Sequence, residues 1–260
     1  MTVVPIASTP PEMLLVRTRA AQKAQQMLDR IVRDRSIGIA IANPGVGKSY
    51  LLKAWRRRNP RARYVWIEAD VVLSPRPIIN ALLDALGIAA AQTRGNLWDK
   101  TQAVAEVLAA QAQTSPLTVI LDEADLLTVR AFDLLRSIWD RVSEQLDTDG
   151  ESAFPLALFG TPQLRVKILR PELERLHRRV AEMVVLDPMN ERELEMALNA
   201  KWPGVRCEPE AVSALLSLSR GSFGWLNRIV PMAQALAAKD GKVVTARIVE
   251  ASKEYLVGLE

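Results

Sequence analysis

Cysteine and histidine are nearly absent from this chain of 260 residues, which has one of each, Cys207 and His177. A single cysteine cannot form a disulfide within the chain or build a cysteine-ligated metal site. A single histidine likewise excludes His-based catalytic triads and zinc sites made of several histidines. We therefore expect a protein of a reducing, cytoplasmic setting whose chemistry uses other residue types.

Long apolar runs are also lacking. The sequence has no apolar stretch of the roughly 18 residues that a membrane-spanning helix needs. Its N-terminus lacks a positively charged segment followed by an apolar one, so we expect no secretion signal. Because 49% of the residues are hydrophobic and 25% are charged, the composition indicates an ordinary globular protein with no membrane partner.

The residues from Ile39 to Ser49 are typical of an apolar strand, a glycine-containing loop and the start of a helix. The N–H groups of such a loop, together with the positive end of the helix, bind phosphate oxygens. Lys48 adds a charge for the β- and γ-phosphates, and the Ser49 hydroxyl is placed for Mg²⁺. The usual first glycine of this motif is replaced by Ala42. The predicted nucleotide-binding residues of this phosphate loop are Asn43, Pro44, Gly45, Val46, Gly47, Lys48, Ser49 and Tyr50.

A second motif follows a buried strand predicted at Leu117–Leu121, which ends in Asp122 and Glu123. Open α/β sheets bind ligands beyond the carboxyl ends of their strands, so we expect Asp122 to help hold Mg²⁺. Glu123 is expected to polarise the attacking water. The plainer interpretation is a pair of surface carboxylates at a strand end. The letters Asp-Glu-Ala-Asp continue to position 125, but a helicase of that type needs a second motor domain, for which this chain is too short.

Strands and helices alternate along the first part of the chain, which predicts an α/β fold with a three-layer αβα parallel sheet. From Asn190 onward every segment is typical of a helix, and Asn190 with Glu193 resembles a capping box. We therefore predict a nucleotide-binding domain over residues 1–188 and a small all-α lid domain over 189–260. The first helix is predicted at Val16–Arg33. The predicted strands are Ile37–Ile41, Arg63–Glu68, Leu117–Leu121, Ala153–Phe159 and Met183–Leu186, and the lid helices Glu191–Lys201, Pro209–Ser219, Phe223–Ala238 and Ala246–Val257.

This arrangement resembles the AAA+ ATPases, over about residues 14 to 257. Within that class the chain is most similar to small ATPases that regulate DNA transposition, of the Mu B, TnsC and TniB type, and to the ATPase core of the ExeA type. Four passages carry the likeness: Asn43–Ser49, Leu121–Asp125, Phe159–Leu164, and Arg179–Val180 leading through Val185–Leu186 to Pro188–Met189. The first two are shared across much of the class, whereas the last two together are more discriminating.

The resemblance implies roles at matching positions. Thr161 matches a polar residue that orients the lytic water, although a threonine there can equally cap the next helix. Arg179 matches the arginine that such assemblies insert into a neighbour's nucleotide site, and the adjacent Arg178 is an alternative. Both arginines can also be explained as a basic helix end.

The predicted lid departs from the family pattern in one respect. Many relatives carry an arginine about three residues after a glycine in the third lid helix, where it contacts the nucleotide phosphates. Here Gly221 is followed by Ser222, Phe223 and Gly224, so that arginine is missing. Arg228, one helical turn further on, is the candidate replacement, and without a replacement we expect slow hydrolysis.

The leading hypothesis is an ATP- and Mg²⁺-dependent ATPase that regulates DNA transposition. ATP binding would drive head-to-tail assembly on duplex DNA as a ring or helical filament. The assembly would recruit and stimulate a transposase and help select target sites, and hydrolysis would dismantle it. The net charge is only +4, but six basic residues and no acidic one lie between Leu51 and Ile67. Such clusters attract phosphate backbones, although more often they are solvated helix ends. Weak candidates for non-specific DNA contacts are Lys53, Arg56, Arg57, Arg58 and Arg76.

Two alternatives remain. A secretion-associated ATPase of the ExeA type has a similar core but generally continues into a membrane span and a wall-binding part, which we do not expect after residue 260. A nucleotide-binding switch or scaffold with little turnover is favoured by Ala42 and by the missing lid arginine.

Overall fold

The computed structural model of the chain describes residues 2–3, 18–88, 95–112, 114, 116–238 and 243–256. These residues fall into two compact units. Of the described residues, unit 1 contains 2–3, 24–42, 55–88, 95–112, 114 and 116–185, and unit 2 contains 18–23, 43–54, 186–238 and 243–256. The C-terminal helices and the phosphate loop thus belong to the same unit, although they are far apart in the sequence.

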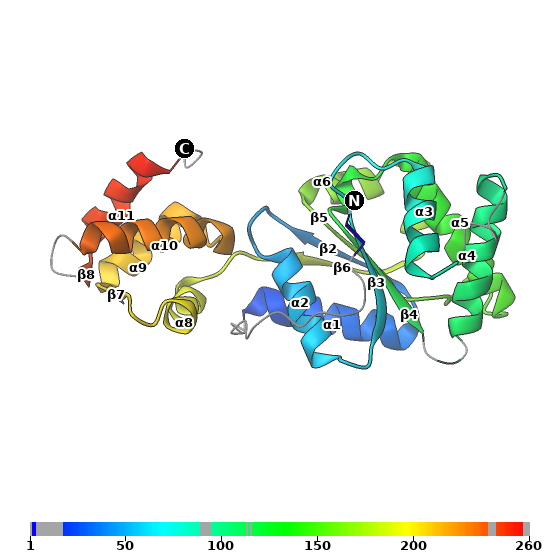
Figure 1. Ribbon diagram of the computed structural model, residues 1–260, viewed down its shortest axis with the longest axis horizontal. Helices are drawn as coiled ribbons and strands as arrows, with labels where there is room; N and C mark the ends of the chain where they lie inside the picture. Colours follow the sequence, from blue (N-terminus) through cyan, green and yellow to red (C-terminus); the bar gives the residue numbers. More distant parts are fainter. Residues whose placement is uncertain are drawn as a thin grey trace. The chain divides into compact units, whose positions relative to one another are not determined.

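Unit 1 is built around one sheet with the strand order β1-β3-β4-β5-β2-β6 (Figure 1). Strand β3 pairs in parallel with β4, β4 with β5, and β5 with β2, whereas β1 is antiparallel to β3. The strands are β1 (Thr2–Val3), β2 (Ile37–Ala42), β3 (Arg63–Glu68), β4 (Leu117–Asp122), β5 (Leu156–Gly160) and β6 (Val180–Leu186).

The central strands are apolar on both faces because helices cover both. Helices α3, α4 and α5 lie together beside the sheet (Figure 1). In β2 the side chains of Ile37, Ile39 and Ile41 join the core that these helices form. The other face of β2 lies against α1, where a Cβ on Gly38 would come within 2.8 Å of the Ile31 side chain. In chain order, the helices before the C-terminal region are α1 (Arg19–Asp34), α2 (Lys48–Arg58), α3 (Pro75–Ala85), α4 (Leu97–Ala112), α5 (Val129–Gln145), α6 (Pro162–Ile168) and α7 (Glu174–His177).

The C-terminal part of unit 2 packs four helices around their own apolar core. Two two-residue strands, β7 (Arg206–Cys207) and β8 (Val243–Val244), form a parallel pair that the sequence did not predict. The helices are α8 (Glu191–Lys201), α9 (Pro209–Ser219), α10 (Phe223–Ala237) and α11 (Ala246–Ser252), followed by a 3₁₀ turn at Lys253–Tyr255.

The predicted three-layer α/β fold with a C-terminal helical region is therefore confirmed. Helices α8 and α9 have the predicted bounds, while β6 begins three residues before the predicted strand. The predicted first helix includes residues 16–17 and the predicted last one includes residue 257, which lie outside the described residues. The domain boundary at residue 188 stays a prediction.

The capping box at the start of α8 is present, since Asn190 and Glu193 bond reciprocally to each other's backbone N–H at 2.9 Å. Burial raises the pKa of the Glu193 carboxyl, but hydrogen bonds from the Arg19 and Asn190 N–H groups and from the Arg19 guanidinium outweigh it. The pKa is therefore lowered from its usual 4.5. A carboxylate of this kind stabilises the fold above its unfolded pKa and loses that contribution as the pH falls through the lowered value.

When the pH is lowered from roughly 5 to 3, we expect the melting temperature of Glu193→Gln to fall less than that of the wild type. Glutamine can complete the capping box but carries no charge to lose. Thermal melting of both proteins across this pH range checks the expectation. Parallel melting curves that differ by a constant offset at every pH would contradict it.

Candidate functional site

The phosphate loop lies in unit 2 and has the backbone that its sequence predicted. Gly45 and Gly47 have φ values of +82° and +101°, which residues with a side chain rarely adopt. The Val46 N–H closes a turn on the Asn43 carbonyl at 3.3 Å, and α2 begins at Lys48. Because the first N–H groups of a helix have no helical acceptors, this end of α2 is suited to bind an anion. The Lys48 side chain is buried, with 7% of the residue exposed.

The start of α10 lies against this loop. The Gly224 N–H donates to the Gly45 carbonyl at 3.0 Å. One residue earlier, the Phe223 ring stacks on Tyr50 of α2, with ring centroids 5.8 Å apart. Within unit 2, the phosphate loop and α2 are therefore in direct contact with the start of α10.

A small, largely apolar cavity adjoins the loop within unit 2. Its volume of about 20 Å³ is room for roughly one water molecule and is far below that of a ligand pocket. Its lining includes Val46, Gly47, Tyr50, Asp187, Met189 and Phe223. The sequence had indicated only Val46, Gly47 and Tyr50 of these as nucleotide-binding residues, because the others are distant from the loop in the chain.

In unit 1 the predicted carboxylates lie at the carboxyl edge of the sheet, where β4 and β5 end side by side. Asp122 is 1% exposed and accepts the Glu123 N–H at 3.0 Å. Glu123 has a φ of +53°, in the left-handed region that glutamate seldom occupies. Residues with strained backbone angles cluster at functional sites. The positive φ of Glu123, directly after the buried Asp122, therefore supports a functional role for this edge of the sheet.

Asp125 links this edge to the end of β5. Its carboxylate accepts the Thr161 N–H at 2.9 Å, while the Thr161 hydroxyl accepts the Gln163 N–H at 3.3 Å and so caps α6. The Lys167 ammonium donates to the Asp125 and Leu127 carbonyls, the latter at 2.8 Å, and burial lowers its pKa. The capping interpretation of Thr161 thus holds in the structure, and its catalytic role stays a prediction. Asp125 lies in a sequence motif, but neither Asp125 nor Lys167 was identified from the sequence as a positioning residue.

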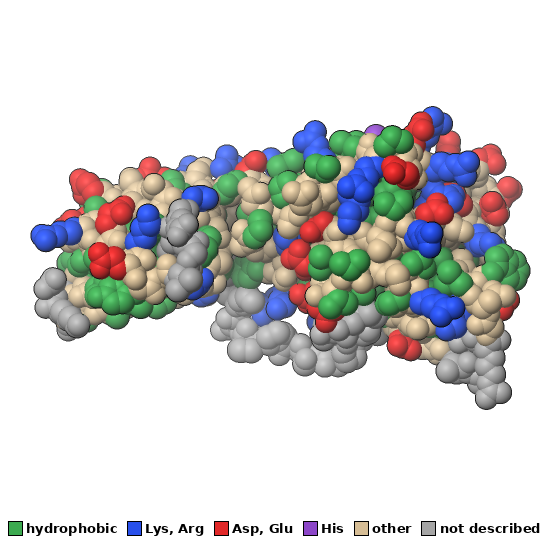
Figure 2. Space-filling view, turned by 90° about the horizontal axis from the view of Figure 1, so that it is seen from above, with side chains coloured by type: hydrophobic (Ala, Val, Ile, Leu, Met, Phe, Trp, Pro, Cys, Tyr) green, Lys and Arg blue, Asp and Glu red, His purple; other side chains and the backbone are tan. Residues whose placement is uncertain are grey.

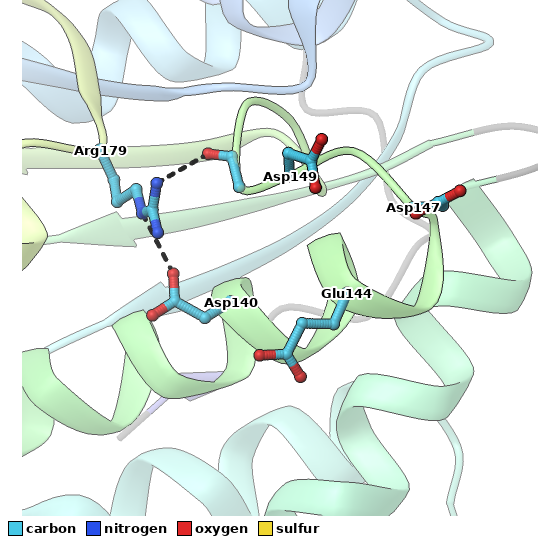
Figure 3. Close-up of a pocket in the computed structure, with 6 residues that line it drawn as sticks. Asp140, Glu144, Asp147, Asp149 and Arg179 are labelled. Carbon is cyan, nitrogen blue, oxygen red and sulfur yellow. Dashed lines mark hydrogen bonds and ion pairs between the residues drawn. The ribbon is translucent and has the colours of Figure 1, made fainter.

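The predicted trans-acting arginine, Arg179, has partners within its own unit (Figure 3). Its guanidinium donates to the Asp140 carboxylate at 3.2 Å and to the Gly150 carbonyl at 3.1 Å, and it lies 5.9 Å from the centre of the Trp139 ring. Arg178 is more exposed, at 74% of its side chain, and pairs with Glu174. Arg179, Asp140 and Gly150 border a hollow of about 430 Å³ whose other lining residues are Glu144, Asp147 and Asp149.

The other basic candidates have varied surroundings. Arg56 lies over the Tyr64 ring at 5.3 Å, and Arg58 donates to the Gln25 side chain. Arg228 is exposed and lies over the Trp225 ring at 4.9 Å. On the face shown in Figure 2, basic and acidic side chains are interspersed.

Arg76 and Lys53 are both exposed. Arg76 lies in the first turn of α3, close in the chain to Val71 and Val72, which are 60% and 69% exposed. The segment after β3 therefore presents both apolar and cationic side chains to solvent.

None of the helices that the structure describes has the length and apolar character needed to cross a bilayer. The described residues also contain no group of three or more His, Cys, Asp or Glu side chains able to hold a metal ion. Mg²⁺ is commonly held by one or two protein oxygens together with substrate phosphates. The Ser49 hydroxyl and the Asp122 carboxylate are each oxygen donors of this kind, and their role as Mg²⁺ ligands stays a prediction.

Comparison with known sequences gave one family match, in which residues 30–168 match the family described as "AAA domain". A search of curated proteins gave no match.

Solved structures with a similar fold are numerous. Cdc6p from Pyrobaculum aerophilum is 18% identical with a TM-score of 0.69, over 99% of this chain and 73% of that one. The ORC1 protein of Aeropyrum pernix, solved in complex with DNA, is 18% identical with a TM-score of 0.64, over 94% of this chain and 66% of that one. A RuvB mutant from Thermotoga maritima is 18% identical with a TM-score of 0.54, over 91% and 68%. At this identity the likeness concerns the fold.

Proposed function

The chain belongs to the AAA domain family, and from this premise we propose that it binds ATP with Mg²⁺ and hydrolyses it. The observation that carries the proposal is the phosphate loop, where two glycines with positive φ lead into the start of α2 at the buried Lys48. This backbone suits bound phosphate oxygens, and Lys48 supplies the compensating charge.

Each predicted residue has a defined part in the reaction. Mg²⁺, held by the Ser49 hydroxyl and Asp122, would neutralise charge on the phosphates. Glu123 would accept a proton from the water that attacks the γ-phosphorus, giving ADP and inorganic phosphate. Thr161 would orient that water, and the Asp125–Thr161 hydrogen bond of 2.9 Å holds its backbone in place.

Our finer proposal is a regulator of DNA transposition that assembles with ATP on duplex DNA and recruits a transposase. It is supported by the sequence resemblance, by the exposed Arg76 and Lys53, and by the fold shared with an ORC1 protein solved in complex with DNA. Contacts to phosphate would be independent of DNA sequence.

Negative-stain imaging of the chain with duplex DNA tests this proposal, with ATP, with ADP and without nucleotide. We expect rings or filaments on DNA only with ATP, and none with Lys48→Ala. ATP binding without any assembly on DNA would contradict the role in transposition while leaving the nucleotide site intact.

A second candidate function is a nucleotide-dependent switch with little turnover. It is favoured by Ala42 in place of the first glycine of the phosphate loop and by Gly224 at the place of the missing arginine. Steady turnover that is lost in Glu123→Gln would dismiss it.

A further inference from the structure

The four residues from Gly221 to Gly224, here called the lid turn, lead from just after α9 into the first two residues of α10, and the proposed function gives them no part. Their first residue lies against the segment that leads into α8. Gly221 has a φ of +67°, and its carbonyl accepts the Met189 N–H at 3.0 Å. A Cβ at Gly221 would lie 2.5 Å from the Met189 carbonyl oxygen, so both the backbone conformation and the space require glycine there.

The last residue of the lid turn lies against the phosphate loop. The Gly224 N–H donates to the Gly45 carbonyl at 3.0 Å. A Cβ at Gly224 would lie 3.2 Å from the Gly45 Cα, and one at Gly45 would lie 2.1 Å from the Ser222 hydroxyl oxygen. The two backbones therefore meet directly, and a side chain on either glycine would push them apart.

Between these ends, Phe223 is held by rings on both sides. It stacks on Tyr50 at 5.8 Å and lies tilted against Trp202 at 6.2 Å. The Lys201 ammonium lies 4.8 Å from the Phe223 ring centre and 5.0 Å from that of Trp202. Offset aromatic pairs and cations over rings add to the apolar burial of these side chains. The lid turn is thus fixed to α2, to α8 and to the phosphate loop at once.

We propose that the lid turn positions the phosphate loop for a nucleoside triphosphate through the backbone contact between Gly224 and Gly45. A peptide unit is planar, so a donor on the Gly45 carbonyl fixes the peptide plane from which the chain continues to Gly47 and Lys48. The contact takes the place of the arginine side chain that the lid lacks, and Gly224 acts as a positioning residue. The inference rests on the proposed nucleotide binding.

Binding of a ribose-labelled fluorescent ATP, followed by anisotropy beside thermal melting, tests the inference. We expect Gly224→Ala to weaken binding roughly three- to tenfold, because small misplacements of binding groups are costly. Gly224→Arg, which places an arginine where relatives have one, should weaken binding at least as much, because its Cβ meets the same Gly45 backbone. Gly204→Ala is the matched control and should bind as the wild type does, since a Cβ there meets nothing within 4 Å.

A positioning role predicts a raised KM with a smaller change in kcat, and a melting temperature close to that of Gly204→Ala. Wild-type affinity in Gly224→Ala, or tighter binding or faster turnover in Gly224→Arg, would overturn the inference. A folded wild-type protein that fails to bind ATP would instead overturn the proposed function.

If Gly224→Ala does not fold, hydrogen exchange in the wild-type protein decides the question. We expect ATP to slow exchange of the Gly224 amide, because the loop that accepts its hydrogen bond becomes ordered around phosphate. An exchange rate that is the same with and without ATP, in protein shown to bind it, would overturn the inference.

Discussion

Glu123→Gln will lower the rate of ATP hydrolysis by roughly 10²- to 10⁴-fold, the range that general acid–base catalysis contributes, and will leave ATP binding intact. Glutamine has nearly the same shape but cannot accept the proton of the attacking water. The left-handed backbone of Glu123, with φ +53°, is retained, so the side chain keeps its direction from the end of β4.

Phosphate release and ATP binding, measured on the same preparations, check this prediction. Glu172→Gln, an equivalent change at an exposed glutamate of the same unit, serves as the control and should hydrolyse ATP at the wild-type rate. Turnover in Glu123→Gln within a factor of about three of the wild type would remove Glu123 from the mechanism, since loss of a general base costs far more.

Arg179→Ala will reduce the turnover of the assembled protein by roughly 10³- to 10⁵-fold if Arg179 acts in a neighbour's site as such arginines do. The structure also holds this guanidinium through Asp140 and the Gly150 carbonyl, so loss of local structure has to be separated from loss of catalysis. Arg178→Ala, at the adjacent and more exposed arginine, tests the alternative assignment.

Mixing two inactive variants distinguishes a loss of local structure from a loss of catalysis. A subunit with Arg179→Ala has an intact Glu123, and a subunit with Glu123→Gln has an intact Arg179. In a mixed head-to-tail assembly the second can complete the site of the first, so we expect turnover to recover on mixing. If the mixture stays as inactive as its components, while mixing with Arg178→Ala recovers turnover, Arg178 is the trans-acting residue and Arg179 has a structural role.

Motifs made of consecutive residues could be predicted from the sequence. The phosphate loop needs only a strand, two glycines and a helix start, and both glycines have the expected positive φ. Asp122 could be placed at a strand end because an apolar, β-branched run precedes it. The capping box of Asn190 and Glu193 was predictable for the same reason, since its partners are three residues apart.

Contacts between distant residues could not be predicted in this way. The hydrogen bond from Thr161 to Asp125 spans 36 positions, and that from Arg179 to Asp140 spans 39, with no periodic pattern to indicate either. The pair of β7 and β8 was missed because two-residue strands have no alternation to detect. The sequence showed that an arginine is missing at Gly224, but only the structure shows that the Gly45 backbone lies there instead.

Calorimetric titration of the chain with Mg²⁺ and ATP, beside Lys48→Ala, tests the central claim most directly. We predict one ATP site per chain and an affinity lowered by roughly 10- to 100-fold in Lys48→Ala, the cost of losing a charge-assisted hydrogen bond. The two proteins should show similar melting temperatures without nucleotide. A folded wild-type chain that binds no ATP, or binds it as well after Lys48→Ala, would contradict the account.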